Sequence, residues 1–169
     1  GVAAYGVIAN LSLVVMSIYT GIAQGVQPLI SRCHGRGDRV RVGALLRQSL
    51  LLAAAVSALI YPALLLFAGP VTGLFNSGGD ARLQAIAERG LRLYFAACLS
   101  AGVNIILSVY FTSIERPRPA QAISLLRGFG LILPLAFLMA AQFDMDGVWL
   151  AFPAAETAVA LIGAALYKS

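Results

Sequence analysis

Long stretches without charged side chains constrain this chain more than any other feature. Residues 1–31 contain no Asp, Glu, Lys or Arg, and a second such run extends over residues 48–68. Three more apolar runs follow at 93–114, 120–141 and 147–167, and the last two hold one charged residue each. A hydrocarbon core about 30 Å thick is spanned by roughly 20 mostly apolar helical residues. The sequence therefore predicts a multi-pass membrane protein.

The overall composition supports this class. Hydrophobic residues make up 60% of the chain and charged residues only 11%, whereas soluble domains carry about 25% charged residues. A water-soluble bundle with so few charges would expose too much apolar surface. We therefore predict an all-α, polytopic transmembrane helical bundle. Its five spans are expected at approximately 5–31, 43–68, 91–114, 120–141 and 147–167.

The net charge of +5 is distributed as topogenic charge. Basic residues gather at the ends of apolar runs and build no soluble face, so we expect no nucleic-acid partner. Under the positive-inside tendency the basic connections face the cytoplasm. This places the first residue outside and the last residue inside, in the inner (plasma) membrane. The basic residues that define the cytoplasmic side are Arg32, Arg36, Arg39, Arg41, Arg116, Arg118 and Lys168.

Two charged residues fall well inside predicted spans. Glu156 lies nine positions after Gly147, about 13 Å along a helix, and a charge at that depth is unfavourable unless it is paired or hydrated. Glu156 is therefore either a carboxylate that binds a proton, a cation or a cationic substrate, or a structural hydrogen-bond or ion-pair partner. Arg127 lies about two turns into the fourth span. It either snorkels or forms a structural ion pair, or it contacts substrate.

Uncharged polar residues also interrupt the apolar runs. Gln24 and Gln27 share one helical face, and Asn104 lies in the middle of the third span. Each either lines a transport pathway or hydrogen-bonds to a neighbouring helix. Gly21 and Gly25 form a GxxxG spacing, which allows close helix packing.

The sequence contains no motif for catalysis or for a resident metal. No Ser–His pair, HExxH sequence or phosphate-cradling glycine motif is present, and Cys33 and Cys98 are too far apart for a metal or redox pair. We therefore expect neither an enzyme nor a cofactor.

Several segments resemble MATE (multidrug and toxic compound extrusion) transporters. The segment AAYG at 3–6, the segment GIAQGVQPLIS at 21–31 and the following Gly35 are similar to the signature of the family's second half. Residues 110–127 resemble the connection between its tenth and eleventh helices. Residues 131–134 and 147–156 resemble its last two helices. The resemblance implies helices eight to twelve of a twelve-helix, two-lobe transporter, with the N-terminal lobe and helix seven absent.

That resemblance also implies a function. Such proteins export organic cations and xenobiotics in exchange for protons or sodium ions. Some members carry a cation-binding aspartate where this chain has Ala101, and no acid occupies residues 90–114, so their sodium site is not expected here. The inner loop also has Glu115 where the family often has glycine.

Two alternatives remain open. One is a lipid-linked oligosaccharide flippase or exporter of the same superfamily, which would be expected to hold pyrophosphate with more basic residues than Arg127 alone. The other is a nonfunctional, truncated remnant.

Overall fold

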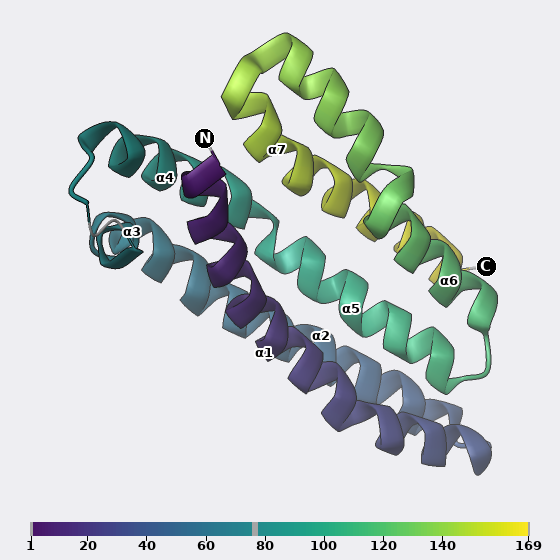
Figure 1. Cartoon of the computed structure of the whole chain (residues 1–169). Coiled ribbons are helices and arrows are strands. Elements are labelled where there is room, and N and C mark those ends of the chain that lie inside the picture. The colour runs from purple at the N-terminus through teal and green to yellow at the C-terminus, as the bar shows by residue number, and fades with distance from the viewer. Residues whose placement is uncertain (1, 76–77, 169) are drawn as a thin grey trace.

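The computed structural model describes residues 2–75 and 78–168, and within them the fold is a bundle of helices without strands (Figure 1). The all-α prediction is confirmed. Helices long and apolar enough to cross a membrane are found five times, as predicted. They are Ile8–Gly35, Arg39–Leu66, Ala81–Ser113, Pro117–Asp144 and Asp146–Lys168.

The first two spans form an antiparallel helical hairpin. α1 (Val2–Gly35) and α2 (Arg39–Leu66) are joined by a turn in which Gly37 has φ +75°, a left-handed conformation that glycine adopts readily. The Asp38 carboxylate then accepts a hydrogen bond from the backbone N–H of Arg41 at 3.0 Å and caps α2. Because the turn is so short, the helices include most of the basic connection that the sequence placed between spans.

The third span is longer than predicted. The sequence predicts no span between residues 68 and 91, but α3 (Ala68–Phe75) and most of α4 (Ala81–Tyr94) form in this part of the chain. The Asp80 carboxylate caps α4 through the N–H groups of Arg82 and Leu83. α4 is amphipathic, with few consecutive apolar residues, so a search for uncharged runs misses it. The segment NSGG at 76–79 has a composition typical of a turn, and it lies partly outside the described residues.

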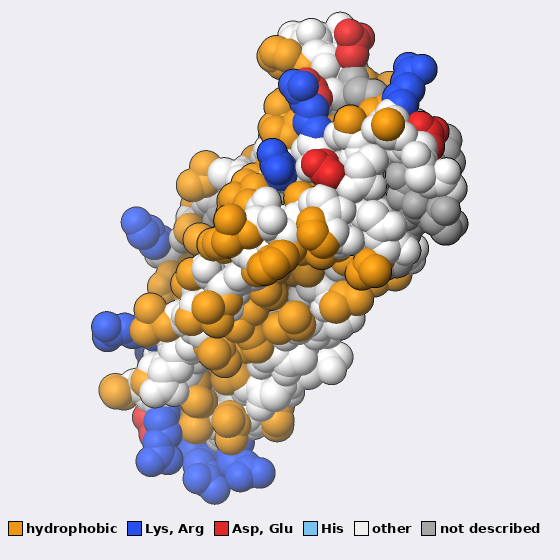
Figure 2. Space-filling model, turned by 90° about the vertical axis from the view of Figure 1, so that its left-hand side faces the viewer, with side chains coloured by type: hydrophobic (Ala, Val, Ile, Leu, Met, Phe, Trp, Pro, Cys, Tyr) orange, Lys and Arg blue, Asp and Glu red, His pale blue; other side chains and the backbone are white. Residues whose placement is uncertain are grey.

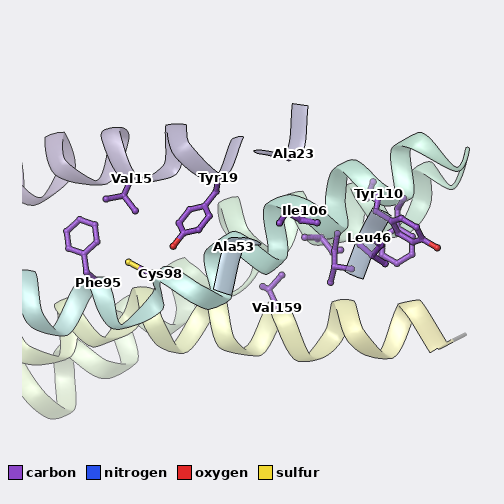
Figure 3. Close-up of a cluster of buried hydrophobic side chains, with 14 of the residues drawn as sticks. Val15, Tyr19, Ala23, Leu46, Ala53, Phe95, Cys98, Ile106, Tyr110 and Val159 are labelled. Atoms are coloured by element: carbon purple, nitrogen blue, oxygen red, sulfur yellow. The ribbon is translucent and has the colours of Figure 1, made fainter. Parts of the chain in front are cut away.

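A 3-10 turn, η1 (Phe95–Ala97), joins α4 to α5 (Cys98–Ser113). α5 occupies the centre of the bundle (Figure 1). Buried side chains from α1, α2 and α7 converge on it, including Val15, Ala53 and Val159 (Figure 3). This packing holds α5 in place at the centre of the bundle.

The last part of the chain forms a second helical hairpin. α6 (Pro117–Leu125) leads into a π-helical turn, η2 (Leu126–Gly130), and then α7 (Ile132–Lys168). In η2 the N–H of Leu131 bonds to the carbonyl of Leu126, five residues earlier, at 3.1 Å. Pro134, four residues after Gly130, has no N–H to donate to the Gly130 carbonyl. α7 reverses direction at Asp144 (φ 53°, ψ −129°), so its two halves lie antiparallel (Figure 1).

The surface suits a lipid environment. Large apolar side chains are exposed, among them Phe137 (77%), Leu59 (75%) and Leu13 (69%). Figure 2 shows hydrophobic side chains over the middle of one face, a cluster of Lys and Arg at the lower end, and acidic side chains mainly at the upper end. This is a multi-pass membrane protein.

A close contact between α1 and α5 yields a first prediction. A Cβ added at Gly102 would lie 2.8 Å from two ring carbons of Tyr19, and the Tyr19 hydroxyl is held by Ser57 Oγ at 2.6 Å. Gly102→Ala should therefore lower the free energy of unfolding by about 1–3 kcal/mol, measured by denaturant titration in mixed micelles. Gly43→Ala is the matched control, because no atom lies within 4 Å of its added Cβ. Equal stability of the two variants would contradict the prediction.

Candidate functional site

Three polar residues predicted from the sequence meet at one place. Asn104 comes from α5, Arg127 from the π-helical turn η2, and Glu156 from the second half of α7. The bundle brings them into mutual contact although they are up to 52 positions apart in the sequence. We call these three residues the mid-membrane cluster.

The cluster lies near the middle of the membrane-spanning region. Glu156 follows Asp146, the start of the fifth span, by ten residues and precedes Lys168, its end, by twelve. At 1.5 Å per residue, it is about 15 Å from the Asp146 end. At such a depth an unpaired charge would be strongly unfavourable.

Arg127 neutralises Glu156 through a forked interaction. The Nε atom of Arg127 lies 3.0 Å from both carboxylate oxygens of Glu156, and its Nη2 atom lies 2.9 Å from Oε1. The Glu156 side chain is only 4% exposed, whereas the Arg127 side chain is 25% exposed. The carboxylate is thus enclosed within the bundle, and Arg127 is the more exposed member of the pair. The ion pair offered as one interpretation of both residues is present, and a role of either residue in binding a proton, a cation or a substrate stays a prediction.

Asn104 completes the contacts of the carboxylate from α5. Its Nδ2 donates to Glu156 Oε2 at 2.6 Å and to the backbone carbonyl of Glu156 at 2.9 Å. Because both partners are acceptors, the amide nitrogen must face them. The Oδ1 atom of Asn104 is consequently fully buried and has no hydrogen-bond partner among the described residues. A buried acceptor of this kind is suited to a bound water, a donor group or a cation.

The π-helical turn sets the position of Arg127. A π turn inserts one extra residue into a helix, and each residue turns the helix by about 100°. The turn therefore changes which side chains face α5 on either side of it. Sequence reasoning found Arg127 but not this turn, for which Pro134 and the neighbouring Gly128 and Gly130 were the available signals.

A stripe of polar side chains continues from the cluster along α5. Its members recur every four residues on one helical face: Ser100, Asn104, Ser108 and Thr112. Ser100 Oγ lies 3.3 Å from Thr157 Oγ1, and Ser108 Oγ lies 3.4 Å from Ser124 Oγ. Sequence reasoning singled out Asn104 alone. The four-residue spacing would have identified the other three.

A cavity of about 430 Å³ opens beside this stripe. It is lined by polar groups of α5 and α6, among them Thr112, Gln121 and Ser124. Because Ser113 and Pro117 mark the end of α5 and the start of α6, the cavity lies between the mid-membrane cluster and the end of the bundle with most of the basic residues. The stripe and the cavity thus place hydroxyl and amide groups on the side of the mid-membrane cluster that faces the basic end of the bundle.

The other predicted residues lie elsewhere, on α1. Gln24 is exposed and Gln27 partly exposed, and neither bonds to another side chain in the described part of the chain. A side chain at Gly21 or Gly25 would meet no atom within 4 Å. The predicted close helix contact is therefore not made between helices of the described residues. Contact of these glycines with another segment, and a pathway role for the glutamines, stay predictions.

A further polar group ties α3 to α4. Gln84 Nε2 donates to Thr72 Oγ1 at 2.7 Å, to the Gly69 carbonyl at 2.8 Å and to Glu88 Oε1 at 2.8 Å. Nearby, Arg89 pairs with Asp146 and links α4 to the reversal of α7. The Gln84 contacts join α3 to α4, and the exposed Arg89–Asp146 pair adds one polar contact between α4 and α7.

Comparison with known proteins places the chain in a family context. The family described as MatE matches residues 1–138. A FAD transporter of Shewanella oneidensis is 28% identical over 166 residues, which cover 98% of this chain and 36% of that protein.

Solved structures share the fold. The MATE transporter VcmN of Vibrio cholerae, in its bent form, superposes with a TM-score of 0.91 at 18% identity, covering 99% of this chain and 38% of that one. A MOP-superfamily transporter from Pyrococcus furiosus, for which reverse polarity of the binding pocket suggests a different function, gives 0.90 at 15% identity, covering 99% and 38%. The chain thus spans less than two fifths of the length of these relatives.

Proposed function

The chain belongs to the MatE family, and on this premise we propose that it forms the C-terminal lobe of a secondary active transporter. In this proposal the transporter exports small organic cations, including xenobiotics, from the cell in exchange for protons or sodium ions. It resides in the inner (plasma) membrane, with the basic end of this lobe in the cytoplasm and the first residue of the chain outside. A second, N-terminal lobe supplies the other wall of the substrate cavity.

One observation carries the cation-exchange proposal. Glu156 is the one acidic residue near mid-membrane among the described residues, and a cation already occupies it in the form of the Arg127 guanidinium. Exchange requires two ligands that compete for one site. A carboxylate that binds either a tethered guanidinium, a proton or a substrate cation provides such a site.

The geometry supports an exchange between these ligands. Arg127 is the more exposed member of the pair, so an incoming cation meets the guanidinium first and takes its place on the carboxylate. Asn104 holds Glu156 in position throughout, because its amide nitrogen, on α5, donates to both the carboxylate oxygen Oε2 and the backbone carbonyl of Glu156. Its buried Oδ1 adds a neutral oxygen ligand for the coupling ion. Rocking of the two lobes then exposes this site to either side of the membrane in turn.

The polar stripe offers a route for the coupling ion. Ser108, Thr112 and Ser124 extend from Asn104 toward the basic end of the bundle. Hydroxyl groups that both donate and accept hydrogen bonds can hold a chain of waters along this path. Protons or hydrated sodium ions could reach Glu156 from the cytoplasmic side along it.

A second candidate substrate is an anionic dinucleotide. The FAD transporter that shares 28% identity with this chain moves a molecule with a pyrophosphate, and the exposed side of the site is an arginine, the side chain that binds phosphate best in a fork. In this case Arg127 would leave Glu156 for the substrate, and the coupling ion would neutralise Glu156. A lipid-linked flippase is less favoured, since Arg127 is the one basic residue at this depth in the described part of the chain.

Flux measurements on the assembled two-lobe transporter in proteoliposomes test this proposal. With ethidium as the cation, wild-type protein should show flux driven by a proton or sodium gradient. Glu156→Gln should reduce this flux about tenfold or more, which corresponds to an increase of about 1.4 kcal/mol or more in the free-energy barrier to transport. Glu115→Gln is the matched control, because Glu115 is an exposed acid at the end of α5. Full ethidium flux in Glu156→Gln would contradict the proposal, and gradient-driven flux of FAD but not ethidium would establish the second candidate.

A further inference from the structure

An apolar groove of about 510 Å³ lies between α2, α5 and α7, away from the mid-membrane cluster. Its walls are leucine, valine and alanine side chains, including Leu50, Leu51 and Val103. The volume is within the range of about 300–1,000 Å³ typical of small-molecule sites. The groove opens sideways, since Leu51 is 59% exposed and Leu99 is 47% exposed.

The length of the groove matches one leaflet of a bilayer. Along α2 it extends from Gly43 to Ala54, eleven residues apart, which is about 16 Å of helix. Half of a hydrocarbon core about 30 Å thick is about 15 Å. The groove therefore runs from one membrane face to the middle of the bilayer.

The end at the membrane face carries two basic side chains. Arg47 and Lys168 both line the groove, and neither forms a salt bridge with an acid of the described residues. The acid nearest in sequence to Arg47 is Asp38, which interacts with Arg41. Tyr167 lies beside Lys168 and also lines the groove, at a depth where tyrosine side chains commonly mark the membrane interface. The groove thus joins an apolar slot to an unneutralised, anion-attracting rim.

We propose that this groove binds an anionic phospholipid of the cytoplasmic leaflet. One acyl chain lies along Leu51, Leu99 and Val103, and the phosphate lies between Arg47 and Lys168. The positive-inside tendency places this end of the bundle in the cytoplasm, and basic pockets between membrane helices on that side favour anionic headgroups. A helix without an acidic side chain at this height would fit the groove less well, because it would bury Arg47 and Lys168 without a counter-charge.

Photolabelling tests the assignment directly. The assembled transporter in nanodiscs is exposed to phosphatidylglycerol or phosphatidylcholine, each with the same diazirine-bearing acyl chain, and labelled residues are mapped by mass spectrometry. We expect phosphatidylglycerol to label the segment around Leu99 and Val103 at least fivefold more than phosphatidylcholine. Unlabelled phosphatidylglycerol should compete, and unlabelled phosphatidylcholine should not.

Two sets of variants make the test specific. Arg47→Gln combined with Lys168→Gln should reduce phosphatidylglycerol labelling to the phosphatidylcholine level. Arg39→Gln combined with Arg118→Gln removes two bases at the same end but outside the groove, and should leave labelling unchanged. Gly43→Leu should reduce labelling by both lipids, because its side chain enters open space and narrows the groove.

Three results would overturn the proposal. Equal labelling by both lipids would show a lipid contact without recognition of the headgroup. Unchanged labelling in the Arg47→Gln, Lys168→Gln variant would separate the bases from the site. Absence of labelling in the groove would show that another segment of the protein covers it. None of these results depends on whether the transporter exports a cation.

Discussion

The free energy of unfolding of the Arg127→Gln variant should be about 3–5 kcal/mol lower than that of the wild-type protein. This substitution leaves the Glu156 carboxylate enclosed at mid-membrane without its counter-charge, and breaking a buried ion pair from one side has effects of that size. The measurement is denaturant unfolding in mixed micelles, followed by circular dichroism. It would be among the largest effects of any single polar substitution in this bundle.

Glu156→Gln should lower the free energy of unfolding by less than Arg127→Gln does. The Arg127 side chain is long and 25% exposed, so it can turn toward water or the membrane interface once its partner is lost. The Glu156 side chain is short and 4% exposed, so it cannot turn toward water or the interface when Arg127 is removed. The double variant should recover most of the lost stability, because no uncompensated charge then remains. The coupling energy from this double-mutant cycle isolates the pair.

The salt bridge between Arg89 and Asp146 provides a matched control for the cycle. Its arginine is 69% exposed and its aspartate 36% exposed, and exposed pairs contribute about 0–1 kcal/mol. Arg89→Gln should therefore have a small effect. Additive effects of Arg127→Gln and Glu156→Gln, with no recovery in the double variant, would show that the two charges are not energetically coupled.

The sequence was sufficient to predict the spans because lipid imposes a length on uncharged runs. It was not sufficient for α4, since Arg82, Glu88 and Arg89 interrupt that helix. α4 is stabilised by its cap at Asp80 and by packing of Ala87 and Leu91, and these signals are local and tertiary. A search for apolar runs cannot detect an amphipathic extension of a span beyond the hydrocarbon core.

The candidate site was predictable as a set of residues but not as an arrangement. Glu156, Arg127 and Asn104 each stand out because polar groups in apolar runs are costly. Their contact depends on the reversal at Asp144 and on the π turn before Pro134, which decide which helical faces meet. For the same reason Gln24 appeared equivalent to Asn104 in the sequence, although the structure leaves it exposed.

The second large effect is expected where α7 packs on α4. Trp149 is 2% exposed and lies against Gly90, where an added Cβ would be 2.6 Å from Cε2 of the ring and 2.8 Å from Cδ1 of Ile8. One turn further along, Phe152 stacks on Tyr94 with ring centroids 4.3 Å apart. Trp149→Ala should lower the free energy of unfolding by about 3 kcal/mol. This is the low end of the range for aromatic residues in protein cores, because the loss in lipid is mainly one of packing contacts.

Because residue 90 is a glycine, the effect of Gly90→Ala on stability can be measured with and without the Trp149 ring. We expect this effect to change sign between the two backgrounds. In the wild-type background, Gly90→Ala should destabilise by about 1–3 kcal/mol, because the large ring has no room to move. In the Trp149→Ala background the same substitution enters the vacated space and adds helix propensity of about 0.8–1.0 kcal/mol, so it should stabilise. Gly43→Ala, whose Cβ meets no atom within 4 Å, should have the same effect in both backgrounds. If Gly90→Ala destabilises equally in both, the constraint at position 90 comes from Ile8 or the backbone, and Trp149 does not dictate the glycine.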